Sequence, residues 1–170
     1  MSSESARMTT AEEARFRIDY PNSKPRAVKV VALDQPSEHV VKRLAERQWQ
    51  RATFFTALKF DGAPRSGEGW SMKAWLSDLA GRTKDLVDEV ATADLVVMVS
   101  SAGTNAEAAA VIAEACSVRK VMTTALIIGS ESKSDEELSK TLASLRPHAS
   151  MLVIANNDDY IEEMLAALRA

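Results

Sequence analysis

The chain has 170 residues, of which 46% are hydrophobic and 26% charged, a balance typical of one soluble globular domain with a substantial core. Its net charge of −3 excludes broad electrostatic attraction to nucleic acid or an anionic membrane, and no apolar run approaches the roughly 20 residues that span a bilayer. The single Cys116 excludes an internal disulfide and a cysteine-based zinc site, and two histidines are too few for a histidine-based metal site. We therefore expect no metal and a reducing cytoplasm.

The N-terminal residues are polar and irregular, and they lack the apolar core of a signal peptide. We expect residues 1–24 to form a flexible arm and residues 25–170 to form one α/β domain. Phe16, Ile18 and Tyr20 alternate with polar residues in a weakly strand-like pattern. We expect these three side chains to dock on the core of the chain itself.

Strand-like and helix-like segments alternate along the rest of the chain. Five strands are predicted, over residues 28–33, 52–60, 95–99, 121–128 and 151–155. Helices are predicted from residue 36 to about 50, from 71 to about 92, from 104 to 116, from 134 to a stop at Pro147, and after residue 158. This alternation predicts a single-domain, three-layer Rossmann-like α/β fold, with a five-stranded parallel sheet and helices on both faces.

Residues 93–116 form the centre of this prediction. Residues 95–99 are an unbroken apolar run, as in a parallel strand buried on both faces. Residues 100–105 are a turn of small residues, after which Thr104 and Glu107 have the spacing of a helix capping box. Such a turn directs backbone amides and a helix N-terminus at the space above the strand, and this favours an anion site.

The candidate site lies at the carboxyl edge of the sheet, because ligands of such folds bind beyond the carboxyl ends of the strands. We expect the loops at residues 34–37, 100–105 and 156–158 to converge there. The candidate ligand contacts are Ser100, Ser101, Gly103, Thr104, Asn105, Asn157 and Asp34.

Several of these residues have a second interpretation. Thr104 is equally suited to helix capping, and Asn157 fits a cap or turn better than a ligand contact. For Asp34 we prefer the N-cap of the next helix. No catalytic residue is assigned, because neither histidine can be placed beside Ser100 or Ser101 as a base.

Three segments resemble the nucleotide-binding domain of the FtsZ/tubulin family. They are VKVVALDQPSEHVVKRLAE (28–46), AGTNAEAAAVIAEAC (102–116) and HASMLVIANND (148–158). The resemblance places Gly103 and Thr104 on a Gly-Thr of the family's phosphate loop and Asn157 where the family contacts the base. It implies a guanine nucleotide or another phosphate-bearing ligand.

The chain departs from the family in two places. The family's first glycine loop is replaced by residues 34–38, where Asp34 and Glu38 would repel a phosphate and Pro36 has no N–H to donate. The family's catalytic acidic loop has no counterpart. The expected function is therefore binding of a nucleotide or other phosphorylated small molecule without efficient GTP hydrolysis.

Two alternatives remain open. The segment from Ser100 to Thr104 is similar to the Ser/Thr loop of phosphosugar-binding SIS domains, which implies a sugar-phosphate enzyme or sensor. The other alternative is a non-catalytic interaction or homo-oligomerisation domain with a vestigial pocket. Neither a nucleic acid nor a membrane is expected as a partner.

Overall fold

The computed structural model describes residues 24–57, 75–78, 82–104, 107–156 and 158–170. The strands are β1 (Val28–Ala32), β2 (Ala52–Thr56), β3 (Trp75–Asp78), β4 (Thr83–Asp85), β5 (Leu95–Ser101), β6 (Met122–Ile128) and β7 (Met151–Ala155). The α-helices are α2 (Gln35–Ala45), α3 (Leu86–Ala91), α4 (Glu107–Arg119), α5 (Asp135–Leu145) and α6 (Asp158–Ala167). Two 3-10 turns, η2 (Ser130–Ser132) and η3 (Arg146–His148), flank α5.

The described strands form one sheet in the order β4-β3-β2-β1-β5-β6-β7. The five strands β2, β1, β5, β6 and β7 are parallel to one another, as the sequence predicts. β1 and β5 lie side by side although β2, β3 and β4 separate them in the sequence, so the chain reverses its direction of travel across the sheet between β1 and β5. This reversal is the switch point at which open α/β sheets bind ligands.

The predicted helix from residue 71 to about 92 is wrong. β3 and β4 occupy part of that stretch and extend the sheet antiparallel from β2, and only the short α3 is helical. Asp85 ends β4 and caps α3, because its carboxylate accepts the amides of Val87 and Asp88 at 2.8 and 3.2 Å. The apolar residues of this stretch fit a helical period locally, but pairing with β2 decides the structure.

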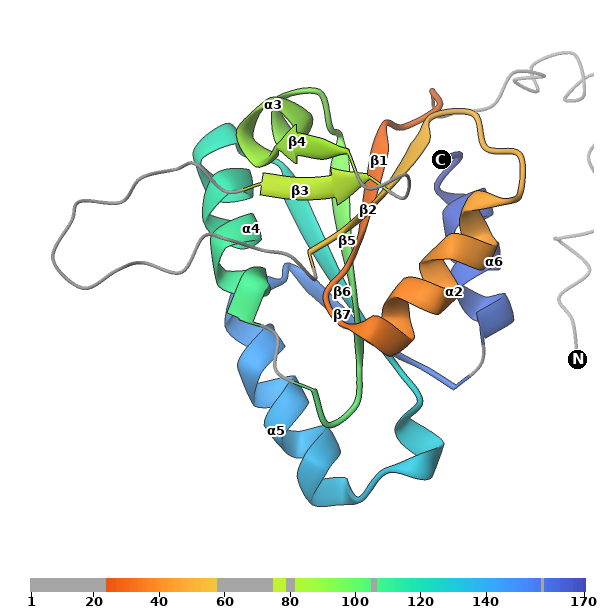
Figure 1. The fold of residues 1–170 in the computed structure, drawn as a ribbon, viewed down its shortest axis with the longest axis vertical. Coiled ribbons are helices and arrows are strands. Elements are labelled where there is room, and N and C mark those ends of the chain that lie inside the picture. The colour runs from red at the N-terminus through yellow and green to blue at the C-terminus, as the bar shows by residue number, and fades with distance from the viewer. Residues whose placement is uncertain (1–23, 58–74, 79–81, 105–106, 157) are drawn as a thin grey trace, which may run out of the picture.

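Helices cover both faces of the sheet (Figure 1). α2 and α6 lie on one face, and α3, α4 and α5 lie on the other. Every residue of β5 is buried. Val97 and Val99 pack in the cluster beneath α2 and α6, whereas Val96 and Met98 pack in the cluster on the opposite face. The predicted three-layer fold is therefore confirmed, with β5 at its centre.

Several local predictions can be compared with the described elements. α2 ends at Ala45, earlier than expected, and the indole N–H of Trp49 folds back to donate to the carbonyl of Leu44 at 2.7 Å. Cys116 is buried in α4, where burial raises its pKa to about 12, consistent with a packing role.

No helix in the described ranges is long and apolar enough to cross a membrane. The predicted arm lies outside the described residues, apart from its last position.

Candidate functional site

Two loops meet at the switch point. Asp34 follows β1 and begins α2 on one face of the sheet, while Ser100 and Ser101 end β5, whose chain continues to α4 on the other face. Ser100 and Ser101 were predicted to lie in the turn but belong to the strand, and both are buried. The third expected loop does not join them, because it follows β7 and β6 separates β7 from β5. The expectation that all three loops converge is therefore wrong.

The Asp34 carboxylate fills the space between the two loops. Its Oδ2 accepts the backbone amide of Ser101 at 2.7 Å, the hydroxyl of Thr104 at 2.8 Å and the hydroxyl of Ser100 at 3.1 Å. Its Oδ1 accepts the hydroxyl of Ser101 and the amide of Ser37, both at 2.9 Å. Asp34 is only 7% exposed, so these five donors replace water around the carboxylate.

This carboxylate is ionised at neutral pH. Burial raises the pKa of Asp34, but hydrogen bonds from the Ser101 and Ser37 amides and the Thr104 and Ser101 hydroxyls outweigh burial and hold the pKa below its ordinary value of 3.8. The negative charge is therefore permanent under physiological conditions. All of its donors except the Ser37 amide belong to residues that the sequence predicts as ligand contacts.

Asp34 also begins α2, as the preferred interpretation of the sequence predicted. Its side chain accepts the Ser37 amide, and its own amide donates to the Ser37 hydroxyl at 3.2 Å, which completes a capping box. Ser37 was not predicted as part of this cap, because a capping box is recognised in a sequence by a Glu or Gln at this position. The same carboxylate thus caps a helix and closes the gap to β5.

The hydroxyl groups around Asp34 all have acceptors within the protein. The Thr104 hydroxyl has acceptors at Asp34 Oδ2 and at the Ser101 carbonyl, 2.8 and 2.7 Å away. The Ser100 hydroxyl has the same Asp34 oxygen and the Ser101 carbonyl as acceptors. Because a hydroxyl has one proton, these groups can offer only lone pairs to an incoming molecule. This polarity is the reverse of that of an anion site.

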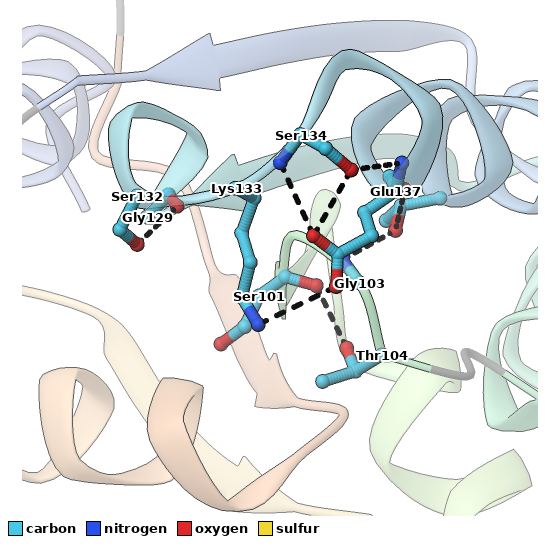
Figure 2. A network of polar contacts seen from close by, with 9 residues as sticks. Ser101, Gly103, Thr104, Gly129, Ser132, Lys133, Ser134 and Glu137 are labelled. Carbon is cyan, nitrogen blue, oxygen red and sulfur yellow. Dashed lines mark hydrogen bonds and ion pairs between the residues drawn. The ribbon is translucent and has the colours of Figure 1, made fainter.

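Gly103 is held by α5 (Figure 2). Its amide donates to the Thr141 hydroxyl at 2.9 Å, and an ideal Cβ built on Gly103 would lie 3.3 Å from Glu137 Oε1. Its φ of +84° is in the left-handed region that favours glycine. The amide that was expected to bind an anion is therefore also occupied. No local pattern in the sequence points to Thr141, which lies 38 residues away.

Glu137 and Ser134 form the predicted capping box of α5. The Ser134 amide and hydroxyl both donate to Glu137 Oε2 at 3.1 Å, while Lys133 lies 3.7 Å from Glu137 Oε1. The hydrogen bond from the Ser134 amide, then that from its hydroxyl, then the charge of Lys133 lower the pKa of Glu137. A second carboxylate of the chain itself thus lies beside Gly103.

The structure does not place the remaining predicted residues. Asn105 and Asn157 lie outside the described residues. Glu38 forms an ion pair with Lys42 and accepts the Thr56 hydroxyl at 3.3 Å, so its carboxylate has contacts separate from those of Asp34.

The structure brings neither histidine to the two serines. His39 contacts the carbonyl of Gln35. The carbonyl of His148 accepts the hydroxyl of Thr123 at the beginning of β6, whereas Ser100 lies at the other end of the strands, near the end of β5. In the described part of the chain, no three His, Cys, Asp or Glu residues are grouped so as to hold a metal ion. A comparison with protein-family models and with curated proteins found no match to this chain.

Proposed function

We propose that this chain is a non-catalytic α/β interaction domain, in which the chain's own carboxylate closes the ligand edge of the sheet. The observation that carries the proposal is the set of five donors around Asp34, which includes the Ser101 amide at 2.7 Å. These are the donors that a phosphate would need. The Asp34 carboxylate accepts these hydrogen bonds in the place that the phosphate would occupy.

Charge argues in the same direction. A phosphate brought within about 4 Å of an ionised Asp34 would meet a repulsion on the order of 4 kcal/mol for each unit of charge at an effective dielectric constant of 20. Glu137 adds a second negative charge beside Gly103, although Lys133 partly offsets it. An anion can therefore bind here only if Asp34 leaves its place.

The test is a titration of the full chain with phosphate, GTP, GDP and a sugar phosphate, followed by thermal melting. A closed edge predicts no stabilisation of the wild type by any of them. Asp34→Ala removes the carboxylate and leaves its donors in a small buried space, so we expect acetate or formate to raise the melting temperature of this variant but not of the wild type.

Glu38→Ala is the matched control, because it removes a neighbouring carboxylate that takes no part in the contacts of Asp34. The acids should leave its melting temperature unchanged. Stabilisation of the wild type by a nucleotide or a sugar phosphate would contradict the proposal.

A phosphate-binding module is the second candidate, and the strand order favours it. Ligands of parallel sheets bind where the strand order reverses, and that position lies between β1 and β5. In this alternative a nucleotide, as in the FtsZ-like interpretation, or a sugar phosphate, as in the SIS-like one, displaces Asp34. It predicts wild-type stabilisation that Ser101→Ala and Thr104→Val both weaken.

A further inference from the structure

Two exposed methionines lie at one corner of the sheet. Met122 begins β6 and is 62% exposed, and Met151 begins β7 and is 47% exposed. Both lie on the face that carries α2 and α6, because Met122 is opposite Leu95 and Met151 alternates with Val153, and both of these residues belong to the cluster beneath those helices. Thr124 is opposite Met151, so the two methionines are diagonal neighbours at the amino ends of adjacent strands.

α6 leaves these strand ends uncovered, because it crosses the face of the sheet diagonally (Figure 1). The helix begins at Asp158, just beyond the carboxyl end of β7. Its other end lies by the amino ends of β1 and β2, where the carbonyl of Arg169 accepts the amide of Arg26 at 3.1 Å and the carbonyl of Ala170 accepts the amide of Gln50 at 2.9 Å. α2 lies over β1, β2 and β5. The amino ends of β6 and β7 are therefore outside the area that these two helices cover.

The flank of α6 that borders this area is apolar. Glu162 faces α2, because it pairs with Arg47 at 2.7 Å. Tyr160 and Met164, two residues before and after Glu162, lie on the opposite side of the helix, and the amide of Leu168 donates to the Met164 carbonyl and continues the same stripe. Tyr160 is 42% exposed, and the other two are partly buried. The methionine corner is the surface that this stripe forms with the exposed methionines: Met122, Met151, Tyr160, Met164 and Leu168.

The other large apolar side chains that are exposed in the described part of the chain are isolated. Val118 is 57% exposed on α4, which covers the opposite face of the sheet. Ile154 is 41% exposed and points to that opposite face, because it alternates with Leu152 of the other cluster. Single exposed apolar residues are normal, whereas a contiguous group marks a surface that another segment or molecule covers.

The position of the first described residues indicates which segment is near the methionine corner. Leu168 of the corner directly precedes Arg169, whose carbonyl accepts the Arg26 amide. The Arg51 guanidinium donates to the Pro25 carbonyl at 3.5 Å and fixes the chain one residue earlier. Residues 1–23 therefore begin beside one end of the methionine corner, on the face that carries α6.

The sequence of that segment has the pattern that the corner needs. Phe16, Ile18 and Tyr20 alternate with Arg17 and Asp19, which is typical of a strand with one apolar and one solvated face. Methionine side chains are flexible and make favourable contacts with aromatic rings, so an apolar face with two aromatic residues suits a surface rich in methionine.

The lengths agree as well. An extended chain from Phe16 to Tyr20 is about 13 Å long, and the stripe from Tyr160 to Leu168 rises about 12 Å along the helix axis. β7 is three strands from β1, which is about 14 Å, and the six steps from Tyr20 to Arg26 extend to about 20 Å. The connecting residues 21–25 include two prolines, an asparagine and a serine, which favour the turn that leads from the corner to Arg26.

We propose that residues 16–20 of the chain cover its own methionine corner as an extended segment, with the three apolar side chains on the corner and the two charged side chains toward solvent. This gives a place to the docking that the sequence predicts for Phe16, Ile18 and Tyr20. The inference goes beyond the proposed function and does not depend on it, because the corner is at the amino ends of the strands and Asp34 is at the carboxyl ends.

The first test is oxidation of the full chain by dilute hydrogen peroxide, with sulfoxide at Met122 and Met151 followed by mass spectrometry. We expect Ile18→Asp to raise both rates about five-fold or more over the wild type, because methionine oxidation follows exposure. Arg17→Ser, on the other face of the same segment, is the matched control and should leave both rates unchanged. Met98 is fully buried, so a low rate there in every variant shows that the fold is intact.

The second test is cross-linking with a short bismaleimide at low protein concentration. Ile18→Cys is combined with Met151→Cys in one variant and with Val118→Cys in the control, and the native Cys116 is only 1% exposed. We expect the first pair to form a cross-link within one chain about ten-fold faster than the control pair, because docking raises the effective concentration of the two thiols.

Three results would overturn the proposal. Oxidation of Met122 and Met151 at the same rate in the wild type and in Ile18→Asp would mean that the corner is open or has another occupant. Equal cross-linking of position 18 to positions 151 and 118 would show no preference for the corner. Cross-links between position 18 of one chain and position 151 of another would make a second copy the occupant.

Discussion

The backbone amide of Ser101 donates to Asp34 Oδ2 at 2.7 Å, although 67 residues separate the two in the sequence. This bond joins the carboxyl end of β5 to Asp34, the N-cap residue of α2. It crosses the point of the sheet where a ligand would be expected, and it places a negative charge of the chain there. The following predictions concern this contact and the loops around it.

Replacing Asp34 should destabilise the fold strongly. Asp34→Ala leaves the Ser101 and Ser37 amides and the Ser101 hydroxyl without their acceptor and also removes the α2 cap, so we expect a loss of about 3 kcal/mol in the free energy of unfolding. Urea denaturation measures it. Glu38→Ala, which breaks an ion pair with Lys42, should cost about 1 kcal/mol or less. Equal losses in the two variants would contradict the role given to Asp34.

Stability should fall in acid because of the same carboxylate. The pKa of Asp34 in the folded state is below its ordinary value of 3.8, so its contribution to stability is fully present above about pH 4 and is lost as pH falls through the folded pKa. Asp34→Asn cannot titrate at this position. Unfolding free energies measured from neutral pH down to acid should therefore fall less steeply for Asp34→Asn than for the wild type, and parallel curves would refute the prediction.

Gly103 and Gly129 form a matched pair. Both have positive φ, at +84° and +69°, but a Cβ at Gly103 would meet Glu137 Oε1 at 3.3 Å, whereas a Cβ at Gly129 has nothing within 4 Å. Each alanine substitution should cost about 1–2 kcal/mol for the left-handed backbone. Gly103→Ala should cost more, because Glu137 must also shift. Combining it with Glu137→Ala should remove that excess, and a persistent excess would contradict this cause.

Lys120 offers a stabilising change. It has a φ of +57° just after α4, where the Lys120 amide donates to Ser117 and the Val121 amide donates to Cys116. This is the position that favours glycine at the end of a helix. Lys120→Gly should raise the free energy of unfolding by about 0.5–1 kcal/mol. Lys133→Gly, where the backbone is extended with a φ of −119°, should not be stabilising, and a gain there would argue against the conformational reason.

The sequence predicted the parallel strands, the Ser134 cap of α5 and the Asp34 cap of α2, because each depends on neighbouring residues. Prediction failed where distant segments decide the structure. β3 depends on pairing with β2, and the carboxylate of Asp34 meets Ser101 only because β1 and β5 are adjacent. The sequence identified Asp34, Ser100, Ser101, Gly103 and Thr104 as one cluster, but it could not reveal that Asp34 binds the donors around it.

The strand order could be narrowed from the sequence but not fixed. Alternating strands and helices predicted a parallel sheet, yet the expected convergence of the loops after the first, third and fifth strands required the fifth strand to be near β5. β6 lies between them. Thr141 could not be found either, because its hydroxyl meets Gly103 only after α5 has packed on the sheet.

The most direct measurement is a crystal structure of the full chain grown with phosphate or GTP at high concentration. A closed ligand edge predicts the Asp34 carboxylate within hydrogen-bond distance of the Ser101 amide and no anion between β1 and β5. An anion bound to the Ser101 amide, with the Asp34 carboxylate displaced from it, would contradict the central claim.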